Sequence, residues 1–161
     1  MSQLPLALTD GYEWLRSYLA LSRTGVVTPE IEACEASWAQ EFGGHRPAVE
    51  RIRRAPGYPE YADALRNALN FPLTLYRVTR VRDFDAWRTG QLIRPISATF
   101  MLEFARLIMD AYPDDSPTVL VQGEVTDPEA VIMRGRVNRY ELVLDSGRVA
   151  RDRVKVLSYS S

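Results

Sequence analysis

Four side chains in this sequence, on three separate strand-like stretches, are of types that could perform chemistry together. Arg77 lies in an alternating apolar pattern, Ser97 and Thr99 end a second one, and Glu141 lies inside a third. A guanidinium binds carboxylates or phosphates, and a carboxylate in an apolar setting stabilises positive charge that develops on a ligand. If the fold brings the three strands together, these residues predict a site for an anionic ligand.

Each of these residues also has a purely structural interpretation. Arg77 is either an ion-pair partner within the core or a clamp for a diphosphate. Ser97 and Thr99 share one face of their strand, and Thr99 is expected to be the N-cap of the following helix, which leaves Ser97 for a ligand. Glu141 is either a reactive carboxylate, the partner of Arg77, or a group that points outward from an edge strand.

The first 70 residues have the periodicity of helices. Asp10 and Glu13 form a capping box that predicts the start of the first helix, with Tyr12, Leu15 and Leu19 recurring on one face. This part of the chain is therefore expected to be all-helical.

A second helix is predicted to begin at Thr28, because Pro29 follows at the first helical position. Cys34 is expected to be buried in it. His45 follows two glycines and is expected in a loop, ahead of a short basic helix over 47–54.

A further helix is predicted near Pro59. From Phe71 onward the period becomes that of strands. Helices followed by strands indicate an α+β protein with a mostly antiparallel sheet. Strands are predicted at 73–79, 92–98, 118–126, 130–134, 139–144 and 148–157, with a turn or short helix at 83–87 and a helix at 100–111.

Composition excludes several classes of protein. The 161 residues are 46% hydrophobic and 25% charged, as in a globular domain, and the net charge of −1 argues against a general nucleic-acid binder. One cysteine and one histidine exclude a Cys/His zinc site, and no metal is expected. No membrane-spanning run or signal peptide is recognisable, so we expect a cytoplasmic protein, bacterial or acting in the host cytoplasm if phage-encoded.

The order of these motifs resembles that of the mono-ADP-ribosyltransferases of the arginine–serine–glutamate type. In that family the arginine often follows a tyrosine, as in Tyr76-Arg77. The second strand ends in Ser-x-Ser/Thr, as in Ser97-Ala98-Thr99. The glutamate opens Glu-[Leu/Val]-x-Leu ahead of a turn glycine, as in Glu141–Gly147. The resemblance covers about residues 60–157.

The resemblance implies a split sheet of ADP-ribosyltransferase type over 59–161, with NAD as a substrate. It also implies that the helical region 1–58 lies outside the catalytic core, and we expect target recognition there. The implied activity is transfer of ADP-ribose to a macromolecular acceptor by a toxin or phage effector. The alternative is a non-catalytic interaction or inhibitor protein on the same fold.

The same resemblance assigns roles to individual residues. Glu141 would stabilise an oxocarbenium-like ribose, Arg77 would hold NAD, and Ser97 would orient the site. The residues expected to contact NAD are Tyr76, Arg77, Ser97, Thr99 and either Phe100 or Phe104, which would pack on the nicotinamide.

Arg139 departs from the family pattern, which commonly has Glu or Gln two positions before the catalytic glutamate. An arginine cannot orient an incoming guanidinium, so transfer to arginine is disfavoured and an acidic or phosphate-bearing acceptor becomes conceivable. A protein acceptor is favoured over a nucleic acid. A nucleic-acid acceptor would use Arg51, Arg53, Arg54 and Arg139.

Overall fold

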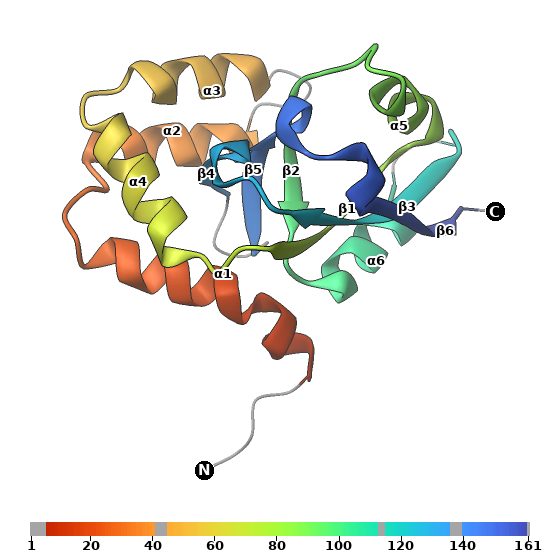
Figure 1. Ribbon diagram of the computed structural model, residues 1–161, viewed down its shortest axis with the longest axis horizontal. Coiled ribbons are helices and arrows are strands. Elements are labelled where there is room, and N and C mark those ends of the chain that lie inside the picture. Colours follow the sequence, from red (N-terminus) through yellow and green to blue (C-terminus); the bar gives the residue numbers. More distant parts are fainter. Residues whose placement is uncertain (1–5, 41–44, 113–114, 136–139, 161) are drawn as a thin grey trace.

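The computed structural model describes residues 6–40, 45–112, 115–135 and 140–160 (Figure 1). Over these residues the chain is an α+β fold with six α-helices and one six-stranded antiparallel sheet, as the sequence predicts at this coarse level. Within the same residues, no helix is both long and apolar enough to cross a membrane.

The strands follow the order β4-β5-β2-β1-β3-β6 across the sheet. The elements are α1 (Leu6–Ser22), α2 (Pro29–Gln40), α3 (His45–Arg54), α4 (Tyr58–Ala68), β1 (Leu73–Arg80), α5 (Val81–Arg88), β2 (Pro95–Thr99), α6 (Leu102–Asp110), β3 (Thr118–Val125), β4 (Val131–Arg134), β5 (Glu141–Asp145) and β6 (Val154–Tyr159).

The two middle strands, β1 and β2, are joined weakly. Strand β1 aligns with β3 along its whole length, whereas it aligns with β2 at a single pair, Tyr76 opposite Thr99. Strand β2 in turn aligns fully with β5. We call the junction at Tyr76 and Thr99 the seam of the sheet, because the two strands diverge from it.

Helices α1 to α4 gather at the β4–β5–β2 end of the sheet, on the left of Figure 1. They share one continuous apolar cluster with the strands, so the N-terminal helices are built into the same core as the sheet. Its fully buried large side chains include Trp14, Leu21, Ile31, Ile52, Tyr61, Leu65, Leu73, Ile132, Met133 and Leu142.

Helices α5 and α6 cover opposite faces of the β1–β3 part of the sheet. Ala105 of α6 packs with Val78 and Leu120, which lie directly opposite each other on β1 and β3. Phe84 of α5 packs with Val121, which lies opposite Arg77 and therefore on the other face.

Several local predictions from the sequence are confirmed. Helix α2 begins at Pro29, and the Thr28 hydroxyl accepts a hydrogen bond from the Ile31 N–H at 3.2 Å, as an N-cap does. Cys34 is buried. Each predicted strand is found, although β2 starts at Pro95 and β6 at Val154, later than predicted.

Other local predictions are wrong. Helix α1 starts at Leu6, upstream of the capping box predicted at Asp10, and His45 is the first residue of α3 and not part of a loop. Tyr12, Leu15 and Leu19 lie on a 40–46% exposed face of α1. Packing against α4 and α6 selects the adjacent face, which carries Trp14, Ser17 and Leu21.

Candidate functional site

Three of the predicted site residues form a row across the seam. Tyr76 on β1 lies opposite Thr99 on β2, which lies opposite Glu141 on β5. Directly opposed residues of antiparallel strands point to the same face of a sheet. Ser97 shares this face because it lies two residues before Thr99 on β2. The row therefore faces the side of the sheet that α6 covers.

Arg77 is the neighbour of Tyr76 on β1, so it lies on the opposite face of the sheet from this row, beneath α5, and bonds across the seam. Its Nη1 donates a hydrogen bond to the carbonyl oxygen of Ser97 at 2.8 Å, and its side chain is half-buried. Burial and then the nearby Arg94 lower the pKa of Arg77 to about 10, while Glu141 among others acts in the opposite direction. The guanidinium thus stays charged near neutral pH in surroundings that favour an added anion.

Glu141 is only 5% exposed and lies on a central strand, between β4 and β2. The interpretation that it points outward from an edge strand is therefore wrong. Its side chain lies over Gly135, where an added Cβ would come within 1.9 Å of Glu141 Cγ. The Gly135 N–H also donates to the Glu141 carbonyl oxygen at 2.8 Å. Gly135 thus provides the space that the carboxylate occupies.

The residue before the glutamate has an unusual backbone. Tyr140 has φ = 48°, a left-handed conformation that costs a non-glycine residue about 1–2 kcal/mol. Its carbonyl accepts from the Phe100 N–H at 2.9 Å, and its ring meets Trp14 edge-on at 4.8 Å and Phe104 at 5.5 Å between ring centroids. Backbone strain held in place by surrounding contacts is common at functional sites.

Thr99 does not cap α6 as predicted. The helix starts at Leu102, and its N-cap residue is Met101, which makes no capping bond with its side chain. Instead, the Thr99 hydroxyl accepts from the Met101 N–H at 3.1 Å and donates to the Tyr140 carbonyl at 3.3 Å. It therefore ties the end of β2 to the residue that precedes Glu141.

Two cavities lie near the seam. One of about 340 Å³ opens between α1 and the start of β1 and includes Tyr76. Within it, the Glu13 carboxylate accepts from the backbone N–H and the side-chain amide of Asn70 at 3.1 and 2.9 Å. Its lining consists of Glu13, Asn70, Pro72, Leu73, Thr74, Tyr76 and Phe100. The other, about 80 Å³, is mainly apolar and lies beneath α5, with Arg77 and Arg94 among its lining.

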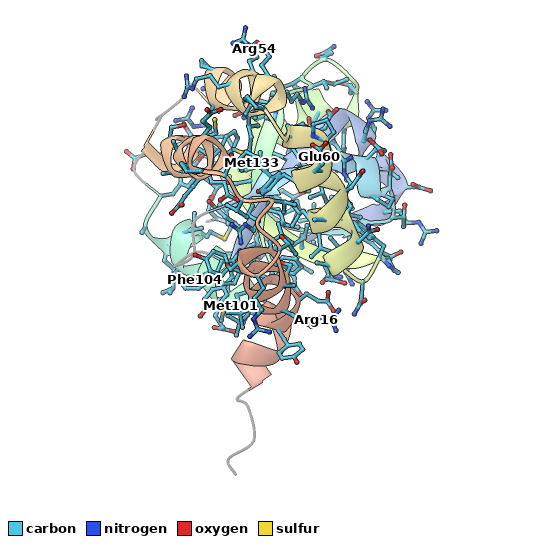
Figure 2. The ribbon with its side chains drawn as sticks, turned by 90° about the vertical axis from the view of Figure 1, so that its left-hand side faces the viewer. Arg16, Arg54, Glu60, Met101, Phe104 and Met133 are labelled. Atoms are coloured by element: carbon cyan, nitrogen blue, oxygen red, sulfur yellow. The ribbon has the colours of Figure 1, made fainter. Side chains whose placement is uncertain are left out.

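Not every predicted residue belongs to this group. Arg139 lies outside the described residues. Arg54, in the basic helix α3, lies at the opposite end of the molecule from Phe104 (Figure 2). Among the residues that the structure describes, no group of three or more His, Cys, Asp and Glu side chains could hold a metal ion.

Sequence reasoning missed Gly135, the cavity role of Glu13 and a buried contact between Glu35 and Arg134. The first had a weak signal, since a glycine next to a strand pattern can mark a place where another group approaches closely. The bond between Glu13 and Asn70 joins residues 57 positions apart, and that between Glu35 and Arg134 joins residues 99 positions apart. No local sequence pattern signals either contact.

Comparisons with known proteins add nothing to this geometry. Neither a scan against protein-family models nor searches of curated proteins and solved structures find a match to the chain. The function of the site is therefore inferred from its residues alone.

Proposed function

We propose that this protein is an NAD-dependent mono-ADP-ribosyltransferase that transfers ADP-ribose to a macromolecular acceptor. The observation that carries the proposal is the convergence at the seam. Arg77 bonds to the Ser97 carbonyl, and Thr99 lies opposite Glu141, although the residues come from three strands spread over 64 positions of the chain. An arginine, a hydroxyl pair and a buried glutamate suit an anionic ligand that develops positive charge during reaction.

Glu141 is the proposed catalytic group. When nicotinamide leaves NAD with the electrons of the glycosidic bond, the ribose becomes oxocarbenium-like. A carboxylate stabilises this charge most strongly where water is excluded, and Glu141 is 5% exposed. Glu141 also accepts a hydrogen bond from the ribose 2′-hydroxyl. The nucleophile of the target macromolecule then attacks the anomeric carbon and releases its proton to solvent.

Arg77 and Ser97 are the proposed binding groups. Ser97 lies on the face of Glu141, whereas Arg77 lies on the other face and reaches the seam through its bond to the Ser97 carbonyl. The Arg77 guanidinium holds the diphosphate, because burial disfavours its charge and an anion beside it would offset that effect. Ser97 is half-buried on the same face as Glu141 and orients the nicotinamide ribose. Thr99 ties the end of β2, which carries Ser97, to the residue before Glu141 through its bond to the Tyr140 carbonyl.

The 340 Å³ cavity supports the proposal by its size and its chemistry. Ligand sites commonly have volumes of roughly 300–1,000 Å³. Glu13, Asn70 and Thr74 offer groups that bond sugar hydroxyls, and Tyr76 connects the cavity to the row that ends at Glu141. We assign the adenosine end of NAD to this cavity.

Phe104 is the better of the two aromatic candidates for the nicotinamide. It is half-buried on α6 and contacts Tyr140, the neighbour of Glu141. Phe100 is 2% exposed and instead forms part of the wall of the 340 Å³ cavity.

Transfer of a label from tagged NAD tests the proposal. Purified protein and its Glu141→Gln variant are each incubated with NAD and a bacterial lysate. Labelling by the wild type alone supports the transferase and shows whether the acceptor is a protein, as we favour, or a nucleic acid. If the wild type releases no nicotinamide, labels nothing and is not stabilised by NAD, the seam belongs to a non-catalytic binding protein.

A toxin or phage effector that acts in a cytoplasm is the setting we propose for this activity. Reduced growth of a bacterium that expresses the wild type but not Glu141→Gln is the expected result. Equal growth with both proteins would argue against a toxin.

A further inference from the structure

Arg134, the last residue of β4, is the centre of a buried polar network that reaches three N-terminal helices. Its Nε and Nη2 donate to the two carboxylate oxygens of Glu35 on α2 at 2.8 and 3.1 Å. Its Nη1 donates to the Tyr18 carbonyl of α1 at 3.1 Å, and its guanidinium lies 4.4 Å from the centroid of the Tyr18 ring. On α4, the Tyr61 hydroxyl accepts from the Arg134 backbone N–H at 3.0 Å and donates to Glu35.

All three guanidinium nitrogens of Arg134 therefore have a partner. Nε and Nη2 share Glu35 of α2, Nη1 bonds Tyr18 of α1, and Tyr61 of α4 joins through the backbone N–H. Burial lowers the pKa of Arg134, but the hydrogen bonds and charge of Glu35 outweigh it, and the net pKa is raised. Burial and then the Glu35 charge raise the pKa of Tyr61 well above its usual value, so its hydroxyl keeps its proton and can donate.

Such a pair is not explained by stability alone. Removing two charges from water costs about as much free energy as their attraction returns, and apolar replacements are often neutral or stabilising. What a bidentate pair supplies is fixed geometry, because the planar guanidinium and the carboxylate meet in one orientation. The strand end at Arg134 is thus fixed relative to α1, α2 and α4.

The residue fixed next to Arg134 is Gly135, on which the Glu141 side chain lies. Arg134 is aligned with Leu142, and the Gly135 N–H bonds the Glu141 carbonyl. Figure 2 shows the neighbouring Met133 at the centre of the molecule, among the N-terminal helices. A shift of the β4 end would therefore move the surface that supports Glu141.

We propose that Arg134 is a positioning residue, which ties the end of β4 to the N-terminal helices and thereby fixes Gly135 and the Glu141 carboxylate. This inference rests on the proposed transferase function. It makes the helices of residues 6–68 part of the catalytic structure, in addition to any role in recognising a target.

The test removes both charges together. The Glu35→Leu, Arg134→Met double variant is expected to fold, with a thermal midpoint lowered only by the lost partners of the Tyr61 hydroxyl and the Tyr18 carbonyl. The kcat of nicotinamide release should fall about 100-fold, because small displacements of reacting groups have effects of this size. The KM for NAD should stay unchanged, because Arg77 is untouched. A purely structural pair would leave kcat unchanged in a folded variant, and that result overturns the proposal.

A matched control acts on the other end of the same strand. Arg66 donates from Nε and Nη2 to the Val131 carbonyl at 3.2 and 2.9 Å, where β4 begins. The Arg66→Met variant should keep the wild-type kcat. If it loses as much kcat as the double variant, any anchor of β4 suffices and Arg134 has no special role.

A second variant covers the case in which the double variant does not fold. Arg134→Lys keeps a buried cation but loses the planar fork, so kcat should fall about tenfold at constant KM.

Amide exchange at Gly135 separates this inference from the proposed function, because it needs no turnover. Exchange should be faster in Arg134→Lys than in the wild type. Unchanged exchange overturns the positioning role even if NAD is turned over, whereas absence of turnover in the wild type overturns the transferase.

Discussion

The side chain of Glu141 occupies the space that a Cβ on Gly135 would fill. An added Cβ would lie 1.9 Å from Glu141 Cγ and 2.7 Å from Cδ and Oε1. Gly135 is not among the described residues with a positive φ, so its backbone would tolerate alanine. The glycine is needed here for space and not for conformational freedom.

Gly135→Ala should therefore displace the Glu141 side chain and lower the rate of nicotinamide release by about 100-fold. The far-UV circular dichroism spectrum should stay that of the wild type. Gly123→Ala is the matched control, because its added Cβ meets only Val154 Cγ2, at an ordinary 3.5 Å. Equal rates in the two variants would show that the position of Glu141 does not matter.

Glu141→Gln keeps the shape of the side chain and removes its charge. Nicotinamide release should fall by about 100- to 1,000-fold, the range seen when one group that stabilises a transition state is removed. NAD should still raise the melting temperature, since Arg77 remains. Rates near those of the wild type would remove Glu141 from the chemistry.

The affinity for a diphosphate should depend on the charge of Arg77. Its pKa in the folded protein is about 10, below the ordinary 12.5, so the guanidinium is charged below pH 10 and loses its proton as the pH rises through that value. Binding of ADP-ribose should be constant between pH 6 and 9 and weaken above about pH 10. Titration calorimetry measures both ranges.

Arg77→Gln supplies the control for this pH dependence. Affinity should be about 10- to 100-fold weaker near neutral pH, the value of a hydrogen bond to a charged group. The decline above pH 10 should be absent. If the affinity of Arg77→Gln for ADP-ribose fell equally above pH 10, a group other than Arg77 would cause the pH dependence.

Tyr61→Phe should destabilise the fold more than Tyr58→Phe does. The Tyr61 hydroxyl accepts from Arg134 and donates to Glu35 within the core, so its loss leaves buried polar atoms unsatisfied and lowers the free energy of unfolding by about 1–3 kcal/mol. The Tyr58 hydroxyl donates a part-buried bond to the Ile132 carbonyl at 2.9 Å, and its loss is expected to cost about 0.5–1.5 kcal/mol. Urea unfolding of both variants measures the difference. If Tyr58→Phe lowered the free energy of unfolding more than Tyr61→Phe, the network around Arg134 would not be the stronger contributor to stability.

The sequence predicted what short-range patterns determine. The alternating patterns around Arg77, Ser97 and Glu141 marked β1, β2 and β5, and Thr28-Pro29 marked the start of α2. Strand alternation and capping depend on residues within a few positions of one another, which is why they are readable from one chain.

The errors arose where tertiary packing decides between local alternatives. On α1, two adjacent apolar faces compete, and packing on α4 and α6 buries the one with Trp14 while Leu15 stays 40% exposed. The Arg134–Glu35 pair joins residues 99 positions apart, and neither has a local signal. The support of Glu141 by Gly135 likewise depends on the register of β4 against β5, which no single-chain pattern fixes.

The single aligned pair between β1 and β2 has a mechanical consequence. The β4–β5–β2 part and the β1–β3–β6 part are each joined by several aligned pairs, with a register shift in β4–β5 and in β3–β6. Between the strands, a small rotation of one part against the other strains mainly the Tyr76–Thr99 pair and the Arg77–Ser97 bond. The sheet is therefore most compliant at the seam, which carries Glu141 on the α6 face and Arg77 on the α5 face. The spacing of the two parts can change there at the cost of few hydrogen bonds.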